Sequence, residues 1–182
     1  MNLVSTMRWA TSNSKIECFK NGEPIYEAKS AEEWSTCSKQ GEPAFMRNDK
    51  NGHLYNAYVI ADTRGFAPDG WKIPDKNDWG QLFEAIEKKQ NSNLPFVVGK
   101  CLGTAKGDLD IGFGPKWSGS INDHNSISPG VLSFENETMT IWTSLKSYEK
   151  NWKAFVMNKK FKEMDFVSLP MGYGALIRLK KC

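Results

Sequence analysis

The sequence has 182 residues and a formal net charge of +3, with 40% hydrophobic and 25% charged residues. These values are typical of one globular domain with a sizeable core, and they exclude a disordered polar chain. A net charge this small does not by itself indicate nucleic-acid binding, and no apolar run approaches the length of a membrane span.

The cysteines indicate a reduced protein. No two of the four stand at a spacing typical of a metal or redox motif, and four in a chain of this size do not make a disulfide scaffold. The N-terminal stretch MNLVSTMRWATSNSK lacks a basic start followed by an apolar run, so we expect synthesis in the cytosol without a signal peptide. The expected free thiols are Cys18, Cys37, Cys101 and Cys182.

The first part of the chain predicts a strand and then a helix. Residues 3–19 mix apolar and polar positions and predict an N-terminal strand, which we expect to pair around Met7–Thr11 with the closing strand, because an isolated strand would leave its backbone groups unpaired. Ser30 and Glu33 have the spacing of a capping box at a helix start, and Gly41 marks the helix end.

A second strand and a second helix follow. Residues 53–60 have strand composition, and a turn rich in Gly and Pro occupies 62–74. Asp75 then caps a helix whose apolar residues recur at helical spacing and form one buried stripe. The residues of this stripe are Trp79, Leu82, Phe83 and Ile86.

The second half of the chain is irregular at first and strand-rich later. Residues 99–137 are rich in Gly, Ser and Asn without periodicity, and a stretch of this kind in a compact domain is usually functional or disordered. Short β-branched or aromatic runs predict strands at 138–145, 152–158, 165–169 and 173–180. Helices early and strands late are typical of the α+β class.

A specific motif lies at 54–79: LYNAYV, then GFAPDGWKIP, then Trp79. This run resembles the Fibrobacter succinogenes major paralogous domain (FISUMP), found in Bacteroidetes-type bacteria and their phages. The likeness extends to FKNGEPIYEAKSAEEW at 19–34 and to MGYGALIRLKK at 171–181, so it covers nearly the whole chain as one domain, 1–182.

The resemblance implies a C-type-lectin-like fold, with two helices packed on a small, mostly antiparallel sheet and a long irregular loop region that presents a ligand surface. It is similar in shape to formylglycine-generating enzymes and to the hypervariable proteins of diversity-generating retroelements. The motif itself we interpret as structural scaffold, because Pro stiffens a turn and large indoles anchor it in a core. The scaffold residues are Trp71, Pro74 and Trp79.

No catalytic or metal site is predicted. His53 and His124 are the only histidines and have no partner at metal-ligand spacing. Asp108 and Asp110 do not belong to a complete calcium loop, because Gly112 breaks the EF-hand pattern, and we interpret them as solvated turn carboxylates. We therefore expect neither an enzyme nor a cofactor.

The candidate ligand surface is the irregular stretch 113–137, where rigid aromatic and small polar residues occur together, as in recognition loops. Trp117 and Phe134 fit equally well as side chains that pin the loop to the core, whereas the small polar residues are expected to be exposed. The candidates are Trp117, Asn122, Asp123, His124, Asn125 and Phe134. The lysines within 146–162 we interpret as solvated strand edges rather than an anionic-polymer site.

Two function classes remain open. One is a structural or receptor-recognition component of a phage virion or phage-like particle, bound to a protein partner or forming a homo-oligomer. This is favoured because the resembled domains are usually exported and no export signal is predicted here. The alternative is a bacterial surface adhesin that binds a glycan or a protein receptor. Neither nucleic acid nor a membrane is expected as a partner.

Overall fold

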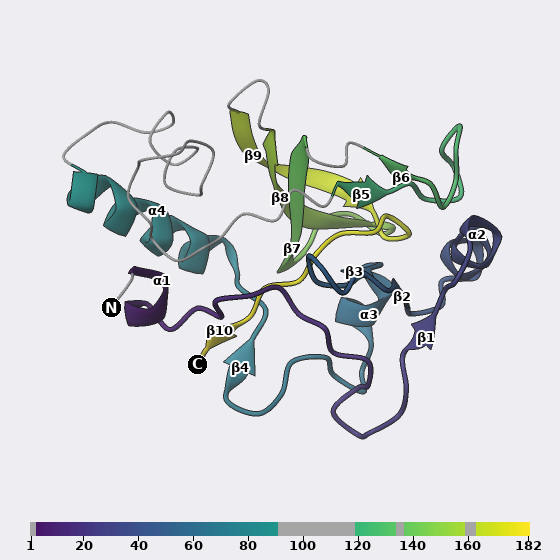
Figure 1. Ribbon diagram of the computed structural model, residues 1–182, viewed down its shortest axis with the longest axis horizontal. Coiled ribbons are helices and arrows are strands. Elements are labelled where there is room, and N and C mark those ends of the chain that lie inside the picture. Colours follow the sequence, from purple (N-terminus) through teal and green to yellow (C-terminus); the bar gives the residue numbers. More distant parts are fainter. Residues whose placement is uncertain (1–2, 91–118, 134–136, 159–162) are drawn as a thin grey trace.

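The computed structural model describes residues 3–90, 119–133, 137–158 and 163–182. The chain forms a mixed α+β fold in which small sheets lie between two helices at opposite ends of the molecule (Figure 1). The longer helix is α4 (Lys76–Gln90) and the shorter is α2 (Ala31–Gln40). The α+β class predicted from the sequence is confirmed.

Helix α2 begins and ends where its caps predict. The hydroxyl of Ser30 accepts a hydrogen bond from the backbone N–H of Glu33 at 3.2 Å. The Glu33 carboxylate in turn accepts from the N–H of Lys29 at 2.8 Å, one residue before the expected partner. Gly41 ends the helix with a φ of 75°, a left-handed conformation that glycine adopts without strain.

Helix α4 has a reciprocal cap made by two carboxylates. The N–H of Asp78 donates to Asp75 Oδ1 at 2.9 Å, and the N–H of Asp75 donates to Asp78 Oδ2 at 3.0 Å. The predicted apolar stripe faces the core, with Trp79 fully buried and stacked on Phe155 at a centroid distance of 4.5 Å. Helix α4 therefore packs against the strand that carries Phe155.

The largest sheet is an antiparallel meander of three strands, β7 (Thr138–Lys146), β8 (Asn151–Asn158) and β9 (Glu163–Pro170). Its strands lie where the short β-branched and aromatic runs predict them. The pairing of β7 with β8 shifts register between Trp142 and Lys146, next to the turn that joins the two strands.

The remaining strands are short. In a second sheet, β2 (Ala44–Met46) pairs in parallel with β1 (Tyr26–Glu27) and antiparallel with β3 (Leu54–Tyr55). Two antiparallel pairs are the other strands of the described residues. They are β4 (Trp71–Lys72) with β10 (Lys180–Lys181), and β5 (Ser120–Ile121) with β6 (Leu132–Ser133).

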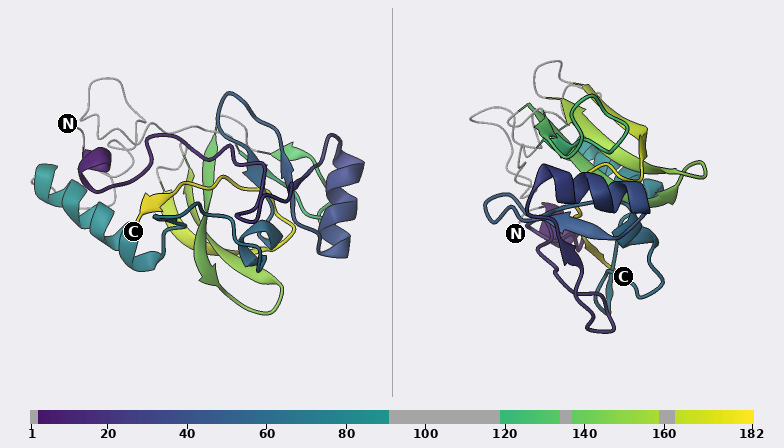
Figure 2. Two further views of the ribbon diagram at one scale, coloured as in Figure 1. Left: turned by 90° about the horizontal axis from the view of Figure 1, so that it is seen from below. Right: turned by 90° about the vertical axis from the view of Figure 1, so that its right-hand side faces the viewer.

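The closing segment, residues 173–181, holds these sheets together. Ala175 bridges to Tyr55 of β3, Gly174 to Ile121 of β5, and Leu176 to Ile141 of β7. The sequence predicts one strand at 173–180. The structure shows isolated bridges instead, because the segment pairs with a different strand at almost every residue. Within this segment, regular strand pairing is confined to β10. Figure 2 shows this segment crossing the centre of the molecule.

The predicted N-terminal strand at 3–19 is wrong as a regular strand. Residues Leu3–Thr6 form a helical turn, α1. The predicted pairing of the two ends of the chain is nevertheless confirmed, because Trp9 forms an antiparallel bridge with Lys180 and the N–H of Ala10 donates to the Leu179 carbonyl at 2.8 Å.

The predicted strand at 53–60 ends early, and Tyr58–Ala61 forms a helical turn, α3. The cause is the buried side chain of Asn56. Its Oδ1 accepts from the N–H of Ala44 at 3.1 Å, and its Nδ2 donates to the carbonyl of Glu42 at 2.8 Å. The side-chain oxygen of Asn56 thus takes the place of a backbone carbonyl as the partner of the Ala44 N–H. The strand pairing ends there, and the chain turns after β3.

Two clusters of buried apolar side chains make up the core. One lies under α4 and includes Trp9 and Trp79, whose rings meet edge to face with centroids 4.8 Å apart. The other is built around Tyr55 and Trp142. None of the helices within the described ranges is long and apolar enough to cross a bilayer.

Candidate functional site

The described part of the predicted ligand surface is the hairpin loop between β5 and β6, residues 122–131, called here the β5–β6 loop. Asp123 was expected to be exposed, but it is only 3% exposed. Its Oδ1 accepts from the N–H of Asn125 at 3.2 Å and from the hydroxyl of Ser126 at 3.0 Å. A carboxylate with such local donors stabilises a turn, so Asp123 shapes the loop from within.

Asn122 also acts inside the loop. Its Nδ2 donates to the Ser128 carbonyl at 3.1 Å and to Ser133 Oγ at 2.9 Å, and its Oδ1 accepts from the Tyr173 hydroxyl at 3.2 Å. These bonds close the hairpin and join it to the closing segment. Asn122 is partly buried rather than exposed, whereas Asn125 is exposed as predicted.

The β5–β6 loop is anchored on helix α2. The N–H of His124 donates to Ser38 Oγ at 3.3 Å, and the same hydroxyl lies 2.9 Å from His124 Nδ1, so it can donate to the ring. Gly130 has a φ of 70°, and a Cβ placed there would lie 2.3 Å from the Ala31 carbonyl oxygen. The backbones of loop and helix are therefore in direct contact, at the end of the molecule where Figure 2 shows both.

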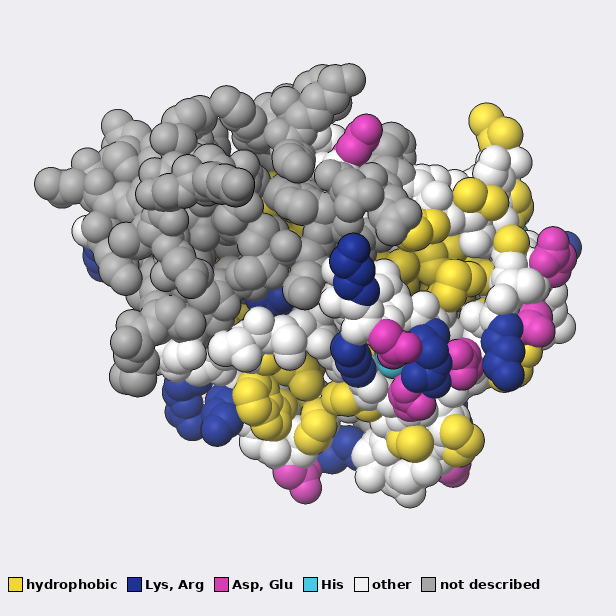
Figure 3. Space-filling view, in the orientation of Figure 1, with side chains coloured by type: hydrophobic (Ala, Val, Ile, Leu, Met, Phe, Trp, Pro, Cys, Tyr) yellow, Lys and Arg dark blue, Asp and Glu magenta, His cyan; other side chains and the backbone are white. Residues whose placement is uncertain are grey.

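The loop presents two apolar side chains to solvent, beside the exposed polar residues Asn125 and Ser128. Ile127 is fully exposed, with a relative accessibility of 104%, and Val131 is 47% exposed. Figure 3 shows hydrophobic atoms at the end of the projection at upper right, where Figure 1 places this loop. Sequence reasoning missed both residues because it favoured polar and aromatic types. The candidates Trp117 and Phe134 lie outside the described residues, so their assignment stays a prediction.

A second candidate site is a cavity of about 560 Å³, called here the N-terminal groove. Residues 10–16, the turn 50–52 and the turn after α3 line it. The sequence predicts Trp71 and Trp79 as core anchors and Pro74 as a residue that stiffens the turn. Trp79 is buried as predicted, and Pro74 is buried too. Trp71 is only partly buried and forms part of the groove wall with Pro68, because the tight turn places its indole at the surface.

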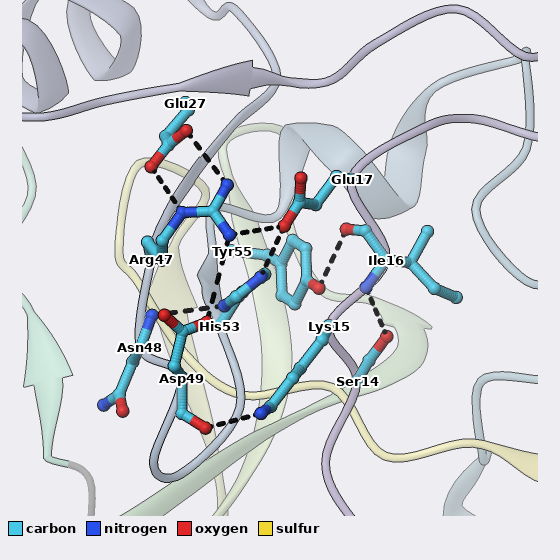
Figure 4. A network of polar contacts seen from close by, with 10 residues as sticks. All are labelled: Ser14, Lys15, Ile16, Glu17, Glu27, Arg47, Asn48, Asp49, His53 and Tyr55. Carbon is cyan, nitrogen blue, oxygen red and sulfur yellow. Dashed lines mark hydrogen bonds and ion pairs between the residues drawn. The ribbon is translucent and has the colours of Figure 1, made fainter.

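Three lining residues, Ser14, Lys15 and Ile16, also belong to the polar network of Figure 4. Arg47 bonds Glu27 through Nε at 2.8 Å and Glu17 through Nη1 at 2.7 Å. Hydrogen bonds from Arg47 lower the pKa of both carboxyls, and His53 adds to the effect on Glu17. The network stays charged near neutral pH and ties the 47–53 segment to the N-terminal segment.

His53 is a buried member of this network, stacked on Phe45 at a centroid distance of 5.0 Å. The N–H of Asn48 donates to His53 Nδ1 at 3.1 Å, so the other ring nitrogen carries the proton and donates to Glu17 at 3.1 Å. These residues come from separate segments with no short motif, which is why no sequence pattern pointed to them.

Beneath the groove lies Arg178, fully buried. Its Nε and Nη2 donate to Oδ1 of Asn13 at 2.9 and 2.7 Å. Burial lowers the pKa of the guanidinium to about 9, so the group keeps its charge at neutral pH. As for metals, no three His, Cys, Asp or Glu side chains converge on a possible ion site in the part of the chain that the structure describes.

Comparison with known proteins adds a family to this geometry. The model of the Fibrobacter succinogenes major domain matches residues 4–181 of the chain. The match includes both the β5–β6 loop and the N-terminal groove, and it confirms the family expected from the motif at 54–79. No curated protein and no solved structure matches the chain.

Proposed function

The chain belongs to the Fibrobacter succinogenes major domain family, and we propose that it is a non-enzymatic binding module that docks a protein partner through the tip of the β5–β6 loop. One observation carries the proposal: an internally bonded loop presents the fully exposed Ile127 and the half-exposed Val131 to solvent. Isolated apolar residues on a surface are common, but here two of them share one ordered loop.

The rigidity of the loop matters for affinity. Asp123 and Asn122 bond the loop to itself, and His124 and Gly130 fix it on α2. Because the loop is ordered before it binds, a partner does not have to provide the free energy of ordering it. Complete burial of an Ile side chain contributes about 1.5–3 kcal/mol, so a few such contacts give useful affinity.

The chemistry of the tip favours a protein over a sugar as the partner. Sugars are bound by polar groups that match their hydroxyls, together with flat aromatic faces, whereas Ile127 and Val131 are aliphatic. We propose that this partner belongs to a larger protein assembly, a virion or virion-like particle, in which the chain is a structural or receptor-recognition component. A bacterial surface domain that binds a glycan or protein receptor is the alternative.

We further propose that the fold is C-type-lectin-like and that the chain catalyses no reaction. Paired chain ends, a helix at each end of small sheets and an irregular loop region support a C-type-lectin-like arrangement. The polar network around Arg47 is arranged as ion pairs that hold segments together. This is how a scaffold uses charged residues, and it supports a binding role.

The experiment compares two exposed hydrophobic residues in different places. Ile127→Asp changes the loop tip, and Tyr148→Asp changes a residue that is 79% exposed beside the β7–β8 turn. Each variant replaces wild type in the natural producer, and its share in large assemblies is measured by size fractionation. The Ile127 variant should leave the assemblies while the Tyr148 variant stays. Equal retention of both variants would contradict docking through this tip.

A further inference from the structure

We propose that the N-terminal groove is a second binding site, specific for a carboxylate-bearing sugar unit of an acidic polysaccharide. It is separate from the β5–β6 loop and does not depend on the protein partner proposed above. The inference rests on three features of the groove: walls that are already formed, an excess of positive charge, and an indole beside small polar side chains.

The walls of the groove are held from both sides. On one side, the N–H of Ser14 donates to the Ile177 carbonyl at 2.7 Å. On the other, the N–H of His53 donates to the Ser14 carbonyl at 3.0 Å, and Nδ2 of Asn13 donates to the Asn51 carbonyl at 2.8 Å. With the N-terminal segment fixed between two neighbours, the groove is present before any ligand arrives, as in most small-molecule sites.

Gly52 shows how closely these walls approach. Its φ is 96°, and a Cβ placed on it would lie 2.5 Å from Cβ of Asn13. Only glycine allows the turn to come this near to Asn13. The position of the turn therefore determines the width of the groove beside Lys50 and Asn51, which line it.

The charge around the groove is positive. Lys15 and Lys50 line it, and the buried guanidinium of Arg178 lies behind Asn13. None of the described lining residues carries a carboxylate. Beside the lining, Asp69 lies 2.6 Å from Lys20, while Arg47 pairs with Glu17 and Glu27 and lies 3.9 Å from Asp49. Lys15 also donates to the backbone carbonyl of Asp49 at 2.5 Å. An anionic group entering the groove meets the ammonium groups of Lys15 and Lys50, with no carboxylate among the described lining residues.

The remaining lining fits a sugar ring. Trp71 offers an indole and Pro68 an apolar edge, against which the C–H groups of a sugar can pack. Ser12 and Ser14 supply hydroxyls near the same wall. Lys181 adds a further cation, with Nζ 5.4 Å from the centroid of the Trp71 ring. A volume of about 560 Å³ lies within the usual range for small-ligand sites.

The test is calorimetric titration with three probes: an oligogalacturonate, the neutral maltotetraose of similar length, and a short oligoglutamate peptide. We expect binding of the oligogalacturonate that weakens as salt is added, and little binding of the other two. Absence of oligogalacturonate binding at millimolar concentration would overturn the proposal. Equal binding of maltotetraose would refute the role of charge, and equal binding of the peptide would make this an acidic-peptide site.

Variants locate the binding. The double change Lys15→Gln and Lys50→Gln should weaken oligogalacturonate binding about tenfold or more, which corresponds to about 1.4 kcal/mol. Lys146→Gln, which changes an exposed lysine on β7, should leave it unchanged. Trp71→Phe tests the indole while keeping an aromatic ring in the groove wall, and its melting curve shows whether the fold is intact. Equal losses in the Lys146 control would show that net charge alone binds the probe and would refute the site.

Discussion

Asp78 and Lys180, far apart in the chain, form an ion pair in which Lys180 Nζ lies 2.6 Å from Asp78 Oδ1. Lys72 of β4 lies 2.7 Å from the other carboxylate oxygen. One side chain in the first turn of α4 thus joins both strands of the β4–β10 pair. Burial opposes the charged form of Asp78, but hydrogen bonds from Lys180 and Lys72 outweigh it and lower its pKa to about 2.

This pKa predicts an acid-dependent loss of stability. Because the folded-state pKa lies below the ordinary 3.8, the contribution is complete above about pH 5 and is lost as the pH falls through 3.8 towards 2. The shift corresponds to roughly 2 kcal/mol. Urea unfolding should show Asp78→Asn less stable than wild type by about this amount at pH 7, with the gap narrowing near pH 2. A gap of equal size at both pH values would contradict the assignment.

Asp69→Asn is the matched control for this experiment. Asp69 is paired with Lys20 at 2.6 Å, but its side chain is 92% exposed. Exposed pairs contribute little to stability, so the variant should unfold at nearly the same urea concentration as wild type at pH 7.

Replacing each of two tryptophans should show which one lies in the core and which one lies at the surface. Trp79→Ala removes a fully buried indole and should cost about 3–5 kcal/mol of unfolding free energy. Trp71→Ala should cost less, about 1–3 kcal/mol, because that indole is only partly buried in the groove wall. Urea denaturation of the two variants makes the comparison. Equal losses would mean that Trp71 is a core residue, as the sequence alone suggests.

Gly130 should tolerate no side chain. In Gly130→Ala the new methyl would meet the backbone of Ala31, in addition to the strain of a positive φ, so we expect a loss of more than about 2 kcal/mol or a displaced loop. Gly70→Ala is the control, since Gly70 has a φ of 76° but open space around it, and should cost about 1 kcal/mol. Thermal melts of both variants measure the difference, and equal melting temperatures would argue against loop–helix contact.

The thiols should react at different rates. Among the described cysteines, Cys18 and Cys182 are exposed, whereas Cys37 is buried in α2, and burial raises the pKa of its thiol. The fourth, Cys101, lies outside the described residues. Since the thiolate is the reactive form, a maleimide should label the two exposed cysteines first and Cys37 slowly in the folded protein. Peptide mapping by mass spectrometry follows each site, and early labelling of Cys37 would mean that α2 opens readily.

The sequence predicted best those elements whose signals are local. Ser30 and Gly41 bound one helix, Asp75 caps the other, and the short β-branched and aromatic runs of β7 and β8 mark the meander. It failed where a side chain redirects the backbone through distant partners. Asn56 turns the chain by bonding Glu42 and Ala44, and no sequence pattern near position 56 predicts these bonds.

The candidate site shows the same limit. The sequence predicts an irregular stretch at 99–137, and where the structure describes it, at 119–133, two short strands, β5 and β6, pair as a hairpin that no local pattern indicates. The sequence also could not tell which polar residues face outward. Asp123 and Asn122 face inward because Ser126, Ser133 and Tyr173 happen to lie within hydrogen-bonding distance in the fold. The exposed residue Ile127 was overlooked because aliphatic side chains ordinarily indicate a core.

Docking through the β5–β6 loop is tested most directly by site-specific photo-cross-linking in the natural producer. A photoreactive amino acid replaces Ile127 in one protein and Tyr148 in another, and the cross-linked products are compared by mass. A discrete protein adduct should form from position 127 and not from position 148. No adduct from position 127, or the same adduct in equal yield from both positions, would contradict the proposed docking surface.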